Sequence, residues 1–352
     1  MKILYVNEDR HENILIACAS SENENIYVIP HKIKGLAGKG NKQYVAKAFK
    51  YMYPNHRYNL WYRFLLMKEI KDIADIEKPD IIHFVSADEY IRLFGFGLSL
   101  LRKYRVVLEL HWCVQTKIRN FSRKILDIKV DHILLHVANI PEYMKKAEYI
   151  ILPAEHDGLI YSNHIAREQL NLHTDKTIIS MIGSMEKYKG VDILLKSLRN
   201  VKNPFFLILA GNLKEYMEEE ILELIAPYKD NVLFLNGYVD DEKFIRLICA
   251  SNYIMVPYRK SFEATSGPMT EAIRCGIPII ASDFGNVGFL THKYNLGYLF
   301  EAENTRSLTN TIDYAIEHPF IKTGSFELYR SNLSHNSFRN NLNKMYNQIV
   351  NK

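Results

Sequence analysis

The chain has 352 residues, of which 47% are hydrophobic and 24% are charged. A chain of this length exceeds one typical hydrophobic core, so two domains are expected, and the composition excludes wholesale disorder. We find no apolar run long enough for a signal peptide or a membrane-spanning helix, which predicts a cytoplasmic protein. Cys18, Cys113, Cys249 and Cys275 are isolated in sequence, so we expect buried, reduced thiols.

The net charge of +5 is distributed unevenly along the chain. Residues 31–73 hold ten Lys and Arg against two acidic residues, which gives this segment a charge of +8 and leaves the remainder at −3. Aromatic residues are interleaved with these cations throughout. Such a mixture suits an anionic membrane surface or a phosphorylated acceptor, although a solvated loop with one amphipathic helix would have the same composition. We expect residues 32–71 to contact an anionic membrane, and we expect no nucleic-acid partner.

Strand and helix signals alternate along the N-terminal half. The first two expected strands are Lys2–Val6 and Ile26–Ile29, and no Gly-rich phosphate loop follows the first of them. Later strands are expected at Ile81–Val85, Arg105–Leu110, His132–Val137 and Tyr149–Leu152, with helices near 60–74, 89–103, 117–128 and 140–147. This alternation is typical of a parallel sheet with helices on both faces.

A second series of the same kind follows residues 153–175, which are polar and helix-poor and which we interpret as an interdomain connection. Strands are expected at Thr177–Ile182, Phe205–Ala210, Val232–Leu235, Tyr253–Val256 and Pro278–Ala281, with helices near 190–200, 214–226, 240–250 and 268–275. The predicted fold class is therefore α/β, with two Rossmann-like, doubly wound domains at residues 1–160 and 175–330. A final helix is expected at 335–351.

Residues 261–282 are the most informative stretch of the sequence for function. Gly267 can adopt the backbone of a helix N-cap, Pro268 suits the first helical position, and Gly276 suits the end of a helix at 268–275. Free N–H groups and the positive end of the helix dipole make such an N-terminus an anion site. Small residues at this position would let a phosphate approach the backbone closely.

Glu263 and Glu271 bracket this helix N-terminus, with seven residues between them. Together with the Gly-Pro, Glu-Ala, Cys-Gly-x-Pro and Ala-Ser pairs in register, they resemble the E-x7-E signature of retaining, family-four (group 1) glycosyltransferases of the GT-B fold. The resemblance implies two Rossmann-like domains facing across a cleft. It further implies that the N-terminal domain binds the acceptor, that the C-terminal domain binds the nucleotide-sugar, and that the helix at 335–351 crosses back to the first domain.

A second motif carries the same resemblance. Gly183, Lys189, Gly190 and Asp192 align with the family's Gly-Arg-x4-Lys-Gly-x-Asp turn, in which the Arg and the Lys clamp the donor diphosphate. Ser184 stands where the Arg is expected, so half of the cationic clamp is missing. Its position after a strand and before a helix places this turn at the carboxyl edge of the sheet, where open α/β sheets bind ligands.

We expect Arg259 or Lys260 to replace the missing cation, because their loop must approach the phosphates, with Lys187 as the lesser candidate. By motif position, Glu271 would hold the ribose hydroxyls and Glu263 the hydroxyls of the donor sugar. The implied catalytic residues are Glu263, His111 and Lys189. The implied donor-binding residues are Gly183, Ser184, Lys189, Tyr238, Val239, Arg259, Lys260, Glu263, Ser266, Gly267, Pro268, Met269, Thr270 and Glu271.

Histidines are the other candidates for chemistry. His111 directly follows an expected strand and is similar to the family's histidine that faces the donor sugar, and His83 is a second candidate of the same kind. His132 and His136 have a spacing that could bind a metal on a helix, but the residues between them indicate a strand, so we reject that site. No Asp-x-Asp occurs in the chain, which favours a metal-independent enzyme without a cofactor.

The resemblance implies a retaining glycosyltransferase that moves a hexose-type sugar from a nucleoside diphosphate donor, with UDP favoured, to a saccharide or lipid-linked acceptor in surface glycan synthesis. Such an enzyme would be cytoplasmic and peripheral on the inner face of the membrane. A GT-B-fold nucleotide-sugar epimerase is an alternative, but it needs a cluster of acid–base residues that the sequence does not reveal. A catalytically impaired transferase acting as a binding partner is another, favoured by Ser184. An NAD-linked dehydrogenase is disfavoured, because neither half opens with a strand followed by G-x-G-x-x-G.

Overall fold

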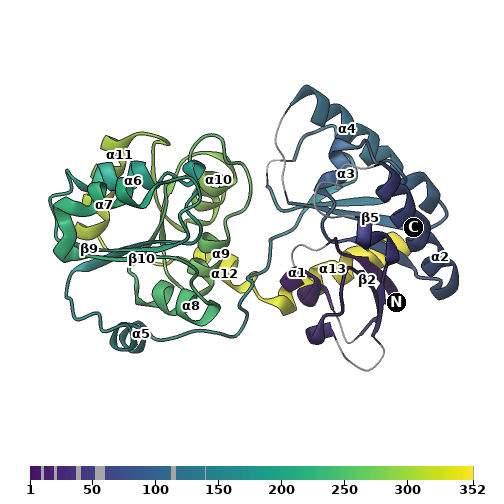
Figure 1. The fold of residues 1–352 in the computed structure, drawn as a ribbon, viewed down its shortest axis with the longest axis horizontal. Coiled ribbons are helices and arrows are strands. Elements are labelled where there is room, and N and C mark those ends of the chain that lie inside the picture. Colours follow the sequence, from purple (N-terminus) through teal and green to yellow (C-terminus); the bar gives the residue numbers. More distant parts are fainter. Residues whose placement is uncertain are drawn as a thin grey trace. The chain divides into compact units, whose positions relative to one another are not determined.

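The computed structural model describes residues 1–8, 12–19, 22–36, 41–51, 60–111, 116–138 and 140–351. The chain divides into two compact units, Met1–Pro153 with His335–Lys352, and Ala154–Ser334. Each unit is a parallel sheet with helices on both faces, which confirms the predicted α/β class (Figure 1). Cys113 lies outside the described residues, as do two cations of the basic segment, Lys39 and Arg57. No helix within the described ranges is long and apolar enough to cross a membrane.

The first unit contains a seven-stranded sheet in the order β3-β2-β1-β4-β5-β6-β7. Its strands are β1 (Lys2–Val6), β2 (Glu24–Ile29), β3 (Lys42–Val45), β4 (Ile81–Phe84), β5 (Arg105–Leu110), β6 (His132–Leu135) and β7 (Ala147–Tyr149). The order reverses between β1 and β4, as in doubly wound folds. The edge strand β3 has no counterpart among the predicted strands, because its sequence, Lys-Gln-Tyr-Val, contains no apolar run and none of its residues is buried.

Helices cover both faces of this sheet. They are α1 (Glu12–Cys18), α2 (Leu60–Glu77), α3 (Asp88–Arg92), α4 (Lys117–Lys129) and α13 (His335–Val350), with short 3-10 turns η1 (Lys34–Leu36), η2 (Lys47–Tyr51) and η3 (Leu98–Leu101). One core contains side chains of α2, α3 and α4, and the core on the opposite face contains side chains of α1 and α13. The C-terminal helix α13, yellow in Figure 1, thus belongs to the first unit.

Two helix predictions in this unit were wrong. The helix expected at 89–103 is divided into α3 and η3, because Gly95 and Gly97 adopt φ angles of +64° and +86° that end a right-handed helix. The helix expected at 140–147 is absent, since the described residues there form turns that lead directly into β7.

The second unit contains a six-stranded parallel sheet in the order β10-β9-β8-β11-β12-β13. Its strands are β8 (Thr177–Ile182), β9 (Phe205–Gly211), β10 (Val232–Asn236), β11 (Tyr253–Val256), β12 (Ile279–Ser282) and β13 (Gly297–Phe300). The five strands predicted in this half are therefore confirmed within one or two residues. The order reverses between β8 and β11, so the loops after these two strands meet at the carboxyl edge.

The helices of the second unit follow their strands in regular alternation. They are α5 (Asn163–Gln169), η4 (Lys187–Lys189), α6 (Val191–Leu198), α7 (Glu218–Ile225), η5 (Ala226–Asn231), α8 (Asp241–Ala250), α9 (Gly267–Arg274), α10 (Gly285–Tyr294), α11 (Thr305–Glu317) and α12 (Gly324–Ser331). Helix α5 lies in the segment expected to be helix-poor. It begins where the Ser162 hydroxyl accepts the Ile165 N–H, a cap that supports a short helix even in a polar sequence.

Candidate functional site at the carboxyl edge of the second sheet

The turn after β8 and the N-terminus of α9 are neighbours. A Cβ placed on Gly183 would lie 3.5 Å from Pro268 Cγ and 3.9 Å from Lys189 Nζ. A Cβ on Gly190 would lie only 2.1 Å from the Pro257 carbonyl oxygen, and its φ is +72°, so this position requires glycine. The two sequence motifs, eighty residues apart, therefore form one site.

Lys189 is held inside its own turn. Its Nζ donates to the Ser184 carbonyl oxygen at 2.7 Å and to the Ser184 hydroxyl at 3.1 Å, and it lies 3.2 Å from a Glu186 carboxylate oxygen. Burial lowers the pKa of Lys189 below its ordinary value, although Glu186 opposes that shift. Ser184 thus occupies the arginine position as a partner of Lys189 and supplies no charge of its own.

Arg259 is directed toward α6. Its Nη2 donates to both Asp192 carboxylate oxygens, at 2.8 and 2.9 Å, and its Nε donates to the Lys187 carbonyl oxygen at 2.9 Å. A guanidinium fixed in this way argues against Arg259 as the replacement for the missing arginine. Lys260 is exposed and has no ion pair with any described residue, so it remains the candidate for that role.

An aromatic cluster fixes the loop that carries Glu263. The Tyr188 and Phe262 rings stack at 5.1 Å with an interplanar angle of 4°, and Tyr258 meets Phe262 edge-on at 4.8 Å. These rings join the turn after β8 to the loop after β11. Sequence analysis missed them, although their spacing around two motifs was a usable signal. Glu263 is half-buried, and its carboxylate forms no hydrogen bond or ion pair with the described residues.

The α9 N-terminus offers fewer free amides than predicted. The cap is Ser266, not Gly267: its hydroxyl accepts the Met269 N–H at 3.3 Å, and its carbonyl accepts the Thr270 N–H at 3.0 Å. Pro268 has no N–H. The Gly267 N–H is therefore the one amide of this turn without a protein partner among the described residues. Gly276, at φ +77°, ends the helix as predicted.

Glu271 is buried and saturated with donors. Its Oε1 accepts the Glu155 N–H at 2.7 Å, the His156 N–H at 3.1 Å and the His156 ring Nδ1 at 3.1 Å. Its Oε2 accepts the Arg274 Nε at 2.7 Å. Burial alone would raise the pKa of Glu271, but the His156 ring and the Arg274 guanidinium lower it. The carboxylate therefore anchors the first residues of this unit, a partnership over more than a hundred positions that the sequence did not reveal.

Tyr238 and Val239 follow β10, next to Gly237, whose φ is +135°. The Tyr238 side chain is 80% exposed, so it is accessible to a ligand and contributes little to the core. The structure places this pair at the same carboxyl edge as Gly183, because β10 pairs with β9 and β9 with β8.

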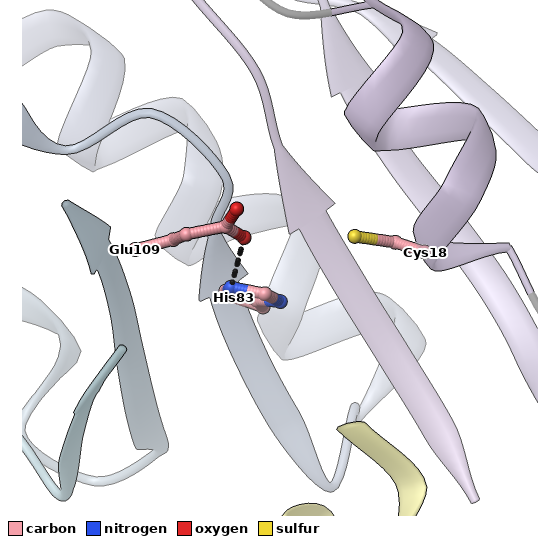
Figure 2. Close-up of side chains that lie close together, drawn as sticks. All are labelled: Cys18, His83 and Glu109. Carbon is pink, nitrogen blue, oxygen red and sulfur yellow. Dashed lines mark ion pairs between the residues drawn. The ribbon is translucent and has the colours of Figure 1, made fainter. Parts of the chain in front are cut away.

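The histidines of the first unit form a separate, buried cluster. His83, Glu109, His111 and His136 are all at most 5% exposed. His83 Nε2 lies 3.1 Å from Glu109 Oε2 (Figure 2), and His136 Nε2 lies 2.7 Å from Glu109 Oε1. Glu109 was missed, although one glutamate within the otherwise apolar run at 106–110 was the available signal. The strand expected between His132 and His136 is confirmed as β6.

The nitrogen, oxygen and sulfur atoms of this cluster are close enough together to be considered as ligands of one metal ion. Cys18, His83 and Glu109 form one group of three within 4.8 Å of one another, and Glu109, His111 and His136 form another. Two ligands around one tetrahedral zinc ion are about 3.3 Å apart, given Zn–N and Zn–O bonds of about 2.0–2.2 Å. The 2.7 Å between His136 Nε2 and Glu109 Oε1 is shorter and is a hydrogen-bond distance, so we assign that contact to a hydrogen bond.

The chain contains two doubly wound parallel sheets. A glycine turn, a lysine and a helix N-terminus lie together at the carboxyl edge of the second sheet. This combination defines a protein of the GT-B fold. Residues 162–336, which hold every residue of that edge, match the family model described as Glycosyl transferases group 1.

Individual relatives are distant. The chain is 27% identical over 183 residues to a glycogen synthase of Thermodesulfovibrio yellowstonii, which covers 52% of this chain and 36% of the relative. It is 23% identical over 241 residues to the D-rhamnosyltransferase WbpZ of Pseudomonas aeruginosa, covering 68% and 62% of the two chains. The chain thus spans about a third and three fifths of the length of these relatives.

Among solved structures, Anabaena Alr3699/HepE in complex with UDP superimposes with a TM-score of 0.73 at 13% identity, covering 99% of this chain and all of that one. At this identity the likeness establishes the fold.

Proposed function

We propose that the protein is a retaining glycosyltransferase that transfers a hexose-type sugar from a nucleoside diphosphate donor to a saccharide or lipid-linked acceptor. The observation that carries the proposal is the meeting of two motifs within the family-matched region. A Cβ placed on Gly183 would lie in van der Waals contact with both Lys189 Nζ and Pro268 at the α9 N-terminus, and the Glu263 carboxylate, which has no partner among the described residues, is on the adjoining loop.

The chemistry follows from what these groups can stabilise. Breaking the anomeric C–O bond places negative charge on the leaving diphosphate, for which Lys189, the Gly267 N–H and the α9 dipole are fixed partners. Each preorganised donor of this sort is worth about 3–4 kcal/mol in other enzymes. Positive charge develops on the sugar, and the half-buried carboxylate of Glu263 would support it.

Retention is proposed from the family resemblance. The acceptor hydroxyl attacks from the face that the diphosphate leaves, and the leaving phosphate takes the acceptor's proton. A double displacement would need Glu263 beneath the anomeric carbon as a nucleophile and is the less favoured version. We propose no metal for either version, because Lys189 and the α9 N-terminus supply the positive charge.

A UDP-sugar is the proposed donor, supported by the UDP in the Anabaena structure of the same fold. The test is a thermal-shift panel of nucleoside diphosphates. A ligand at a hundredfold excess over its Kd should stabilise the protein by about 2.7 kcal/mol. Stabilisation by UDP, lost in Lys189→Ala, is expected. If no nucleoside diphosphate stabilises the wild-type protein, the proposed donor site is wrong.

The buried cluster of His83, Glu109, His111 and His136 gives little support to the alternative of a nucleotide-sugar epimerase. Its acid–base groups do exist, contrary to the impression given by the sequence, but they are enclosed in the core of the first unit. A substrate cannot reach Glu109 or His83 there. A donor-hydrolysis assay beside the UDP-binding assay separates the enzyme from an impaired transferase, because the impaired protein would bind UDP and hydrolyse no donor.

We also propose that the first unit meets an anionic membrane. Within the segment first expected to do so, Lys42 pairs with Glu77 and Lys71 with Asp75, so part of its charge is neutralised internally. Helix α4 provides stronger support. Its exposed face carries Ile118, Phe121 and Ile128, which are 71%, 60% and 79% exposed, interleaved with the exposed Lys117, Lys124 and Lys129. Apolar and basic residues together suit anionic lipid.

A further inference from the structure

Three side chains that can bind a metal meet in the core of the first unit, and each comes from a different element. Cys18 ends α1, His83 lies in β4 and Glu109 lies in β5, and all three are at most 2% exposed. Strands β4 and β5 are neighbours in the sheet, and α1 packs on the face from which His83 and Glu109 project. Figure 2 shows His83 and Glu109 turned toward one another and the Cys18 sulfur directed toward them from α1.

The separations within this group are close to those that one ion imposes. One ligand atom from each of Cys18, His83 and Glu109 lies within 4.8 Å of the other two, and His83 Nε2 is 3.1 Å from Glu109 Oε2. A tetrahedral zinc ion would hold that nitrogen and that oxygen about 3.3 Å apart, and its longer bond to sulfur would place the sulfur about 3.6 Å from each. A small movement of Cys18 therefore brings the three atoms to one ion.

The two atoms that would face the ion are unpaired. His83 Nε2 and Glu109 Oε2 are both buried, and neither forms a hydrogen bond with the described residues, although they lie 3.1 Å apart. Leaving a buried polar atom unpaired costs about 1–3 kcal/mol. Two such atoms side by side call for a bound group that satisfies both. A cation between them would do so.

The atoms that would face away from the ion do have partners. His83 Nδ1 lies 2.6 Å from the hydroxyl of Tyr346 in α13, and Glu109 Oε1 lies 2.7 Å from His136 Nε2. Histidines and carboxylates that bind metals have outer partners of this kind, which fix the tautomer and the orientation of each ligand. Unpaired inner atoms and paired outer atoms together are typical of a metal site.

We propose that Cys18, His83 and Glu109 bind one zinc ion, which joins α1 to strands β4 and β5. Thiolate, imidazole and carboxylate are ligands that zinc accepts, and three of them leave one tetrahedral position for a water molecule. On binding, the Cys18 thiol releases its proton to water and binds as a thiolate, while His83 keeps its proton on Nδ1. The ion is structural, because the core encloses it, and it does not depend on the proposed transferase activity.

The first test measures metal in the full-length chain. After dialysis against metal-free buffer, the wild type should retain nearly stoichiometric zinc by inductively coupled plasma mass spectrometry. After refolding with Co²⁺ it should show the sulfur-to-cobalt charge-transfer absorption that a thiolate ligand produces. Cys18→Ser should lose both. The matched control is Cys249→Ser, which removes an equally buried thiol from the second unit and should keep both.

The second test changes an outer partner. Tyr346→Phe keeps the ring and removes the hydroxyl beside His83 Nδ1, so its affinity for zinc, measured by competition with a chromogenic chelator, should fall about 10–100-fold. A strong chelator should lower the Tm of the wild type, because the folded state loses a bound ligand. The Tm of Cys18→Ser should not respond to the chelator.

Two results would overturn the proposal: a wild-type chain that neither contains zinc nor takes it up on refolding, or a cobalt–thiolate absorption that persists in Cys18→Ser. If Cys18→Ser does not fold, the zinc content and the cobalt spectrum of the wild type decide. A wild type that binds zinc and transfers no sugar would contradict the proposed function and leave the zinc site supported.

Discussion

Glu263 and Glu271 are eight positions apart and have opposite surroundings. Glu263 is half-buried on a loop, and its carboxylate has no hydrogen bond or ion pair within the described part of the chain. Glu271 is buried, with four hydrogen bonds from Glu155, His156 and Arg274. A carboxylate without protein partners is available to a ligand, whereas a saturated one must exchange a protein partner to bind a ribose. Substitutions of the two glutamates should therefore have different effects on stability, nucleotide binding and turnover.

Glu263→Gln should preserve folding and nucleotide binding and lower turnover at least about a hundredfold, equivalent to about 2.7 kcal/mol at the transition state. The reason is that the amide keeps the shape and removes the charge that supports the developing positive charge on the sugar. Calorimetric titration with UDP and donor hydrolysis measure the two effects. A matching loss of nucleotide affinity would contradict the assignment of Glu263 to the sugar end of the donor.

Glu271→Ala should destabilise the second unit by about 3–5 kcal/mol, because it leaves the Arg274 guanidinium, whose side chain is only 10% exposed, and two backbone N–H groups without their acceptor. Nucleotide affinity should fall as well. Chemical denaturation measures the first effect and UDP titration of the folded fraction the second. Unchanged stability would mean that the contacts of Glu271 are not maintained in solution.

Substitutions of Lys189, Lys260 and Arg259, the cations near the turn after β8, should also differ in their effects on turnover and stability. Lys189→Ala and Lys260→Ala should each lower kcat more than they raise the donor KM, and Ser184→Arg should partly rescue Lys260→Ala only. Arg259→Ala should instead cost about 1 kcal/mol of stability with little change in turnover, because its guanidinium is bound to Asp192. Steady-state kinetics distinguish them, and a large loss of kcat in Arg259→Ala would restore it as the second phosphate-binding cation.

At the scale of secondary-structure elements, α4 has two dissimilar faces. Leu126 packs into the core, and the buried Asp127 accepts the backbone N–H groups of Lys145 and Lys146. The outer face combines apolar and basic side chains and carries no exposed acid. Phe121 meets the exposed Phe94 ring at 6.2 Å, so the apolar surface continues toward α3. A face of this kind is costly in water unless a partner covers it.

Phe121→Ser/Ile128→Ser should abolish co-sedimentation with vesicles containing anionic lipid, and Lys117→Glu/Lys124→Glu should do the same while sparing any binding to neutral vesicles. Donor hydrolysis should be unchanged in both. Ile321→Ser is the matched control, since Ile321 is an equally exposed isoleucine on the second unit. Binding that ignores lipid charge and added salt would contradict a membrane-facing α4.

At the scale of the whole molecule, the first unit depends on ionisable groups in its core and the second does so less. Glu109 and His111 both have lowered pKa values in the folded chain. Unfolding exposes them to water, where their ordinary values return. The unfolded state therefore binds more protons as the pH falls, and acid destabilises the fold.

Stability of the first unit should fall by about 2 kcal/mol between pH 6.5 and 5, because in that window the unfolded His111 binds a proton that the folded chain, with a His111 pKa of about 4, excludes. The Glu109 contribution is present above its ordinary pKa of about 4.3 and is lost only at lower pH. Denaturation followed by tryptophan fluorescence measures this unit, since the two tryptophans of the sequence, at positions 61 and 112, both fall before its boundary at Pro153. His111→Gln should flatten the slope.

The sequence by itself determined the α/β class, the alternation of strand and helix in both halves and the residues at the carboxyl edge of the second sheet. These features are encoded locally: periodicity over a few residues defines an element, and a glycine or lysine after a strand falls at the same sheet edge in any doubly wound fold. Gly183, Lys189 and Pro268 could therefore be brought together without coordinates.

Only the tertiary structure decided which polar groups are partners. Glu271 is bound by residues more than a hundred positions earlier, and His83 meets Tyr346 of α13 across almost the whole chain. The sequence around a charged residue in an apolar strand does not show which residue will be its ion-pair partner, because strand register and helix packing bring that partner from elsewhere in the chain. The same holds for Arg259. Its position in the sequence predicted a contact with the donor phosphates, whereas in the folded chain its guanidinium donates to Asp192.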